Sequence, residues 1–206
     1  MTTTTDLLRL LSWLTPAMPI GAFAWSGGLE AAAKEGRVDA KSLGDWLEGL
    51  LRAGPMRQDA VLLAMALRGE DVSEMALALA ASPERWAETE EQGDAFLRAA
   101  EAWLGAGPAR PCALPAAVGW AAREAGLEPS AVVTAYLHAQ VAAVLQAALR
   151  LMPLGQTGSV RIMARLEPAI AETAETAMDG DLGTAALGAE IAALRHAALP
   201  AAMFRS

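Results

Sequence analysis

The amino-acid sequence predicts an all-α fold, a single-domain bundle of about ten helices around a central Ala-rich buried helix at about residues 129–152. Hydrophobic residues make up 54% of the 206-residue chain, and many of them are Ala, the residue with the highest helix propensity. Residues that favour strands are few, with one Tyr and three Phe. Apolar residues also recur at helical spacing between breaks that contain Pro or Gly.

The first eighty residues predict five helices, each between a cap and a break. Thr15-Pro16 ends the first helix, because the residue before a proline disfavours helical geometry. Gly36 is a suitable C-terminal cap for the second. Asp39 or Ser42 opens the third, and Gly54-Pro55 ends it. The expected segments are 7–14, 28–36, 43–53, 59–67 and 73–81.

The rest of the chain predicts five further helices. Ser82 and Pro83 are a strong start, with the hydroxyl at the N-cap and proline at the first helical position. Residues 105–115 hold three prolines and two glycines and are expected to form a loop. The expected helices cover 83–104, 115–125, 129–152, 159–178 and 184–195. Neither a repeat nor a second domain is evident.

We therefore expect one helical domain over residues 1–195, followed by a C-terminal tail at 196–206. The tail has no amphipathic pattern of helix length, and termini of this kind are poorly ordered unless something holds them. Its apolar residues suggest a segment that becomes ordered when a partner binds.

One segment has to be weighed as a membrane span. Residues 129–149 carry no formal charge and are long enough to cross a bilayer. Their middle contains Thr134, Tyr136, His138 and Gln140, and polar groups are costly in hydrocarbon. Large side chains on one side and Ala on the other suit a helix packed on two sides. The pattern therefore favours a buried core helix.

Charge and cysteine content exclude several classes of function. The net charge of −8 disfavours a nucleic-acid partner, because phosphates would be repelled. Cys112 is the only cysteine, so no internal disulfide forms and a reducing compartment is expected. The first residues lack the basic region and cleavage site of a signal peptide. Together these features predict a cytoplasmic protein.

The sequence predicts neither a metal site nor a catalytic site. His138 and His196 are the only histidines and neither pairs with a second ligand, so His138 is expected to be a satisfied interior residue. The stretch GQTGS lacks the Lys of a phosphate-binding loop. Glu90 and Glu91 suit a solvated helix face. We expect no cofactor and no enzymatic activity.

Three segments are not explained by helix packing alone. Residues 16–30 combine Pro and Gly with aromatic side chains, although an ordinary interhelical loop with an aromatic plug is the plainer interpretation. Residues 153–156 suit a tight turn. Residues 203–206 place apolar side chains on the tail and suggest a groove on a partner.

These three segments resemble motifs of the UreF family of urease accessory proteins. PAMPIGAFAWSGGLE resembles the family signature P-x-L-P-[VI]-G-G-F-[ST]-x-S-x-G-L-E. Ala22 and Ala24 replace a Gly and a hydroxyl residue, and Trp25 stands where Tyr is usual. Ala22 predicts that no left-handed backbone conformation is needed there.

Further motifs follow in the order that the family has them. Trp46-Leu47 with the later Asp59 resembles a W-L…D pattern, and Glu88-Thr89 with Gln92-Gly93 resembles E-T-x-x-x-G. Pro153 to Gln156 resembles P-L-G-Q. The segment from His196 to Ser206 resembles the family terminus, except that Ala197 replaces a Glu and Ala202 an Arg.

The resemblance implies a helical homodimer that binds UreD (UreH in some systems), recruits the GTPase UreG and helps deliver nickel to apo-urease. One alternative is a GTPase-activating protein that acts on UreG, and another is an unrelated helical enzyme with a pocket around His138. The partner-binding residues that the resemblance implies are Pro19, Gly21, Phe23, Trp25, Ser26, Glu30, Gly155, Gln156, Met203, Phe204 and Arg205. For Phe23 and Trp25 the sequence leaves packing in the core as an equal alternative.

Overall fold

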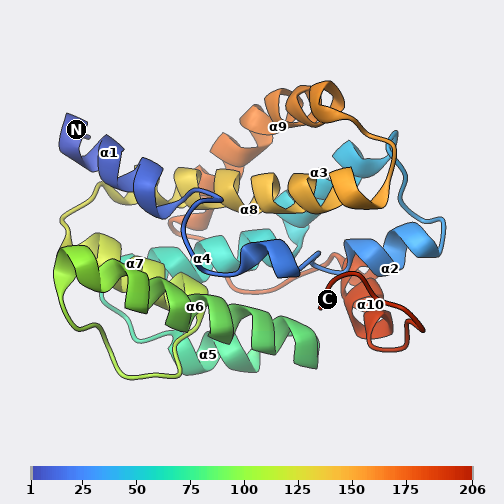
Figure 1. Cartoon of the computed structure of the whole chain (residues 1–206). Coiled ribbons are helices and arrows are strands. Elements are labelled where there is room, and N and C mark those ends of the chain that lie inside the picture. Colours follow the sequence, from blue (N-terminus) through green and yellow to red (C-terminus); the bar gives the residue numbers. More distant parts are fainter. Residues whose placement is uncertain (1, 206) are drawn as a thin grey trace.

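The computed structural model describes residues 2–205, and every regular element in this range is a helix (Figure 1). This confirms the predicted all-α class. The helices are α1 (Thr4–Trp13), α2 (Leu29–Lys34), α3 (Leu43–Ala53), α4 (Pro55–Leu67), α5 (Ser73–Ala78), α6 (Pro83–Leu104), α7 (Leu114–Glu124), α8 (Pro129–Leu151), α9 (Gln156–Ala177) and α10 (Leu187–His196). A short 3-10 helix, η1 (Ala22–Ala24), lies between α1 and α2.

Two helices share the centre of the bundle. α4 is buried along most of its length and packs against α3, α7, α8 and α9. α8 packs against α4 and α9 through a stripe that includes Val133, Leu137 and Val141. α6 and α7 form the opposite layer, and α2 packs against α10 at one end (Figure 1). The loop between α1 and α2 crosses between α8 and the layer formed by α6 and α7 (Figure 1).

α8 is the one helix in the described range that is long and apolar enough to cross a membrane. Half of its most apolar stretch is buried inside the protein. A core helix passes the same test of length and composition, and its packing on α4 and α9 agrees with the predicted core helix.

Three helices begin three or more residues earlier than the sequence predicted. α1 begins at Thr4 instead of Leu7, because the Thr3 side chain caps it and accepts from the backbone N–H of Asp6. α4 begins at Pro55, because Gly54 is its N-cap and proline is well suited to the first helical position. The prediction had used Gly54-Pro55 only as a stop for α3. α9 begins at Gln156, directly after Gly155, whose φ of 69° is accessible to glycine.

The tail packs against its own chain, whereas the sequence predicted a segment that becomes ordered when a partner binds. Phe204 is buried, whereas Met203 is exposed. The physical reason is a set of hydrogen bonds from the tail backbone to Glu30 on α2. Ser206, the last residue of the terminal motif, lies outside the described residues.

Candidate partner-binding site

The signature loop, residues 15–28, depends on glycine at two positions. Gly21 has a φ of 76° and precedes η1, while Ala22 lies inside that helix. No residue other than glycine has a positive φ in the range 2–205, which confirms the prediction for Ala22. Gly28 has a φ of 80°, and a Cβ there would lie 2.9 Å from the backbone nitrogen of Ala193 on α10. The loop therefore sits directly on α10.

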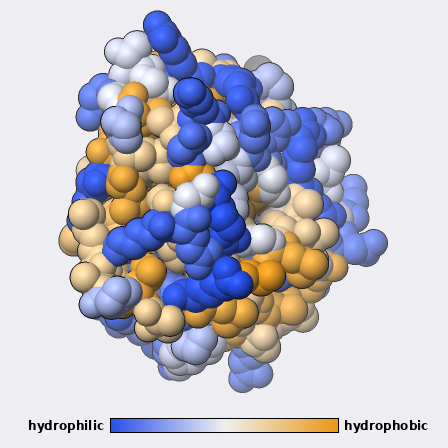
Figure 2. All heavy atoms as spheres, turned by 90° about the vertical axis from the view of Figure 1, so that its right-hand side faces the viewer, coloured by the Kyte–Doolittle hydropathy of each residue, from blue (hydrophilic) through white to orange (hydrophobic). Residues whose placement is uncertain are grey.

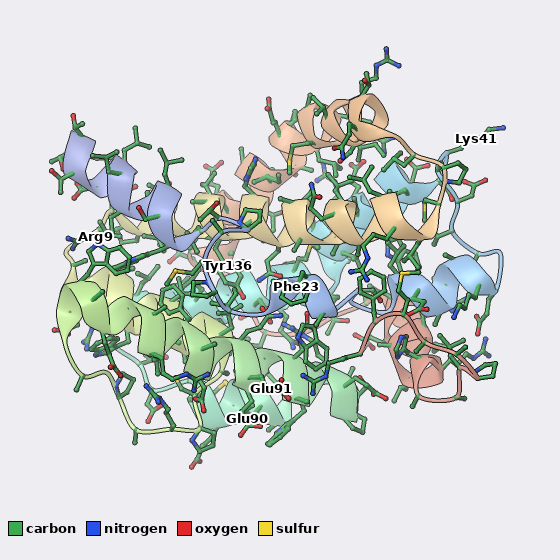
Figure 3. The ribbon with its side chains drawn as sticks, viewed as in Figure 1. Arg9, Phe23, Lys41, Glu90, Glu91 and Tyr136 are labelled. Atoms are coloured by element: carbon green, nitrogen blue, oxygen red, sulfur yellow. The ribbon has the colours of Figure 1, made fainter. Side chains whose placement is uncertain are left out.

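The two aromatic residues of the signature loop have opposite environments. Phe23 is 80% exposed, whereas Trp25 is 5% exposed. The guanidinium of Arg205 covers the ring of Trp25 at 4.3 Å. The sequence left both residues open between core and partner contact, and the structure separates them into an exposed Phe23 (Figure 3) and a buried Trp25.

The carboxylate of Glu30 holds the tail against α2. Its Oε1 accepts hydrogen bonds from the backbone N–H of Met203 at 2.8 Å and from Lys34 Nζ at 2.9 Å. Its Oε2 accepts from the backbone N–H of Phe204 at 2.9 Å and lies 3.1 Å from His196 Nε2. The Glu30 backbone N–H in turn donates to Ser26 Oγ at 3.2 Å.

These contacts decide the charge of Glu30. Burial raises the pKa of a carboxyl group, but the hydrogen bonds from Lys34, Met203, Phe204 and His196 outweigh it and lower the pKa of Glu30 from 4.5 to about 2. Glu30 is therefore ionised at neutral pH, and its negative charge strengthens each of the bonds that hold the tail.

Two arginines join the tail to the signature loop. Arg150, at the end of α8, donates to the carbonyl oxygen of Phe23 at 3.1 Å and lies 4.2 Å from the centre of the Phe204 ring. Arg205 forms an ion pair with Glu91 on α6, and its backbone N–H donates to the carbonyl of Ala24 at 2.9 Å. The signature loop and the tail thus form one surface, which we call the loop–tail surface and define as residues 19–30 and 201–205.

The third motif lies apart from this network. Gly155 and Gln156 are exposed at the start of α9, and no hydrogen bond joins them to the tail among the described residues. Gln156 instead lines the large cavity described below. The structure therefore brings together two of the three predicted segments, and the third borders the same cavity as the signature loop through Gln156.

The E-T-x-x-x-G motif is explained by packing. A Cβ on Gly93 would lie 1.9 Å from the carbonyl oxygen of Cys112. Only glycine at this position therefore allows α6 to approach the loop before α7 so closely. Thr89 Oγ1 accepts a hydrogen bond from the backbone N–H of Leu114 at 3.2 Å. Both residues fix the start of α7 against α6.

A cavity of about 740 Å³ lies beneath the signature loop, between α4, α6, α8 and α10. Most of its lining is apolar, but a group of charged and polar residues forms one part of its wall. Tyr136 OH donates to Asp59 Oδ2 at 3.1 Å, and Arg85 forms ion pairs with both Asp59 and Glu88. Gln92 Nε2 donates to Glu88 Oε1 at 3.3 Å. We call these five residues the Asp59 cluster.

Two members of the Asp59 cluster, Arg85 and Tyr136, keep fixed protonation states. Burial alone would lower the pKa of Arg85. The carboxylates of Asp59 and Glu88 raise this pKa by more than burial lowers it, so the guanidinium stays charged. Burial and the charge of Asp59 raise the pKa of Tyr136 well above its usual value, so the phenol keeps its proton and donates. The cluster links three helices that are distant in sequence.

Several residues of the site carry no clear signal in the sequence. Arg85 and Arg150 belong to no recognised motif, and Glu91 is predicted only as part of a solvated face. His138 was predicted to be an interior residue, and this is wrong, because it is exposed on α8. His196 is the buried histidine instead. In residues 2–205, no group of three or more His, Cys, Asp or Glu side chains is placed to hold a metal ion.

Comparison with known proteins gives a consistent result. The family model named UreF matches residues 38–167. The chain is 46% identical to the urease accessory protein UreF of Cereibacter sphaeroides (strain ATCC 17029 / ATH 2.4.9), over 97% of this chain and 98% of that protein. It is 42% identical to the urease accessory protein UreF of Allorhizobium ampelinum, over 98% and 97%. For the urease accessory protein UreF 1 of Brucella canis the identity is 44%, over 98% and 95%. The chain therefore belongs to the UreF family of urease accessory proteins, which assist an enzyme and are not enzymes themselves.

Proposed function

We propose that this chain is an adaptor of urease maturation, which bridges UreD (or UreH) and the GTPase UreG during nickel insertion into apo-urease. Membership of the UreF family supports the general role. The loop–tail surface is the single observation that supports the bridging role. Two segments more than 170 residues apart are joined there by the Glu30 carboxylate, and exposed apolar side chains remain beside them.

The residues of this surface divide into two roles in the proposal. Phe23, Pro19 and Met203 are exposed and supply contact area to a partner. Buried residues hold these side chains in place, and they are Trp25, Ser26, Glu30 and Phe204. Gly21 provides the left-handed backbone conformation before Phe23, and the guanidinium of Arg205 covers the Trp25 ring. Gly155 and Gln156 are assigned to a neighbouring contact at the start of α9.

Figure 2 faces the side of the molecule on which α2 and α10 lie. Apolar side chains reach this face between hydrophilic ones (Figure 2). A homodimer and a cytoplasmic location are part of the same proposal, because they follow from the resemblance and from the lone cysteine. The gel-filtration mass of the purified chain tests the dimer.

Neither alternative gains support from the site. Arg85 is held by two carboxylates and Arg205 by Glu91, so a role in GTPase activation has no observation that favours these side chains. The helical-enzyme alternative needed polar groups converging around His138, and His138 does not line the cavity. The adaptor role is therefore the one that we propose.

Co-expression tests the proposal. Urease structural subunits are produced with UreD, UreG and nickel, either with this chain or without it, and urease activity is measured. We expect activation only in the presence of the chain. Equal activation in its absence would rule out a role as an accessory protein of this urease. A chain with Lys41→Ala, an exposed change away from the loop–tail surface (Figure 3), serves as the control and should activate normally.

A further inference from the structure

The cavity beneath the signature loop is too large to be a packing defect. Protein interiors contain few voids larger than a water molecule, whereas this cavity measures about 740 Å³. Sites for small molecules usually measure between about 300 and about 1,000 Å³ and combine apolar walls with a few polar groups. Exposed residues such as Phe23 and Leu79 are part of the lining, so the cavity opens to the surface.

The floor of the cavity is made of small residues from one face of α8. Ala139, Ala143 and Ala147 recur every four residues along that face and line the cavity. The sequence predicted that α8 is packed on two sides, but this Ala face borders the cavity. α6 runs along the cavity from Arg85 to Phe96, a distance of roughly 16 Å at 1.5 Å per residue. The cavity is therefore elongated.

The charges around the cavity favour a cation. Three carboxylates line it, from Asp59, Glu88 and Glu190, against two guanidinium groups, from Arg85 and Arg150. Within the Asp59 cluster, Tyr136, Arg85 and Gln92 all donate to its two carboxylates, and one guanidinium faces those two carboxylates. An excess of negative charge in a partly buried place is costly, and a cation would offset it.

We propose that the cavity binds an apolar peptide segment of a partner protein, with a Lys or Arg side chain directed at the Asp59 cluster. The apolar walls take the body of the segment, and the carboxylates of Asp59 and Glu88 accept from its cationic end. A metal ion does not fit, because the described residues offer no group of three ligands. This inference depends on the proposed function only for the identity of the partner.

Three small molecules with alkyl groups of equal length test the chemistry of the cavity without any partner protein. n-Octylamine, 1-octanol and octanoate are titrated into the purified full chain, and binding is followed by calorimetry and by tryptophan fluorescence. We expect octylamine to bind about tenfold more tightly than octanol, and octanoate more weakly still. Binding of octanoate as strong as that of octylamine, or no binding of any probe, would overturn the proposal.

Two variants locate the binding. Ala143→Leu fills the cavity from α8, and we expect it to retain the helical circular dichroism of the parent chain and to lose octylamine binding. Glu88→Gln removes one charge from the Asp59 cluster, and we expect it to abolish the preference of octylamine over octanol. Glu90→Gln, two residues further along α6, is the matched control and should bind as the parent does. Unchanged octylamine binding in both of the first two variants would refute the assignment to this cavity.

The partner is tested separately. The complex of the full chain with UreD and UreG is compared between the parent and Ala143→Leu, and we expect the filled cavity to weaken the complex about tenfold or more. An intact complex together with lost octylamine binding would refute a partner segment as occupant. Failure of the parent chain to form any complex would instead count against the proposed function, while the probe results would still stand.

Discussion

The Glu30 carboxylate and the His196 imidazole lie 3.1 Å apart, although 166 residues separate them in the sequence. Both side chains are almost completely buried. The same carboxylate accepts the backbone N–H groups of Met203 and Phe204. A single ionised side chain on α2 therefore fixes α10 and the tail relative to the signature loop.

Glu30→Gln tests this arrangement. The amide places an NH₂ group among donors and removes the charge, so we expect a loss on the order of 3 kcal/mol in the free energy of unfolding. Urea denaturation measures the loss, and carboxypeptidase digestion reports release of the tail. Glu35→Gln, which affects only exposed ion pairs just after the same helix, should cost about 1 kcal/mol or less. A tail that remains protected in Glu30→Gln would contradict this role.

The pH dependence of stability follows from the lowered pKa of Glu30. The folded-state pKa of about 2 lies below the unfolded value of 4.5, so the stabilisation is complete above pH 4.5 and is lost as the pH falls toward 2. We expect the difference in unfolding free energy between the parent chain and Glu30→Gln to shrink through this window. Denaturation curves measured at several pH values provide the test. A constant difference between pH 6 and 3 would show that Glu30 titrates normally.

Gly93→Ala tests the close approach of α6 to the loop before α7. The added Cβ would lie 1.9 Å from the carbonyl oxygen of Cys112, so backbone must move, and we expect a loss of about 3 kcal/mol or more. Gly49→Ala is the matched control, since nothing lies within 4 Å of its Cβ position inside α3. That change should stabilise the protein by about 0.5–1 kcal/mol. Equal effects of the two substitutions on the melting temperature would contradict the packing argument.

Phe23 and Trp25 separate partner contact from folding. Phe23→Ala removes an exposed side chain, so we expect a change within about 0.5 kcal/mol in stability, together with a loss of about 2 kcal/mol in binding to UreD or UreG. Trp25→Ala empties a buried site beneath Arg205 and should cost about 3 kcal/mol in stability. Denaturation and calorimetric titration give the two quantities. Full partner affinity in Phe23→Ala would remove this residue from the proposed surface.

The sequence predicted the local features of this fold well, because helix propensity, apolar spacing and caps act over a few residues. The start at Ser82-Pro83 is an example, since the Ser82 hydroxyl accepts from the backbone N–H of Arg85. The ends of helices were predicted less accurately where one residue has two roles. Gly54 and Pro55 end α3 and also begin α4, so the predicted gap before residue 59 does not exist.

The site was less predictable than the fold, because its contacts join distant parts of the chain. Glu30 was recognised as a motif residue, but no sequence pattern relates it to Met203 or to His196. The tail was expected to become ordered when a partner binds, since its short apolar stretch has no helical period. Burial of Phe204 arises from backbone hydrogen bonds, which side-chain patterns do not reveal.

The most direct test of the bridging role is retention of UreG on immobilised UreD. The three proteins are purified separately, UreD is attached to a resin, and bound UreG is quantified with and without this chain. We predict that UreG is retained only when the chain is present, and that Phe23→Ala lowers the amount while Lys41→Ala does not. Retention of UreG on UreD to the same extent without the chain would contradict the account.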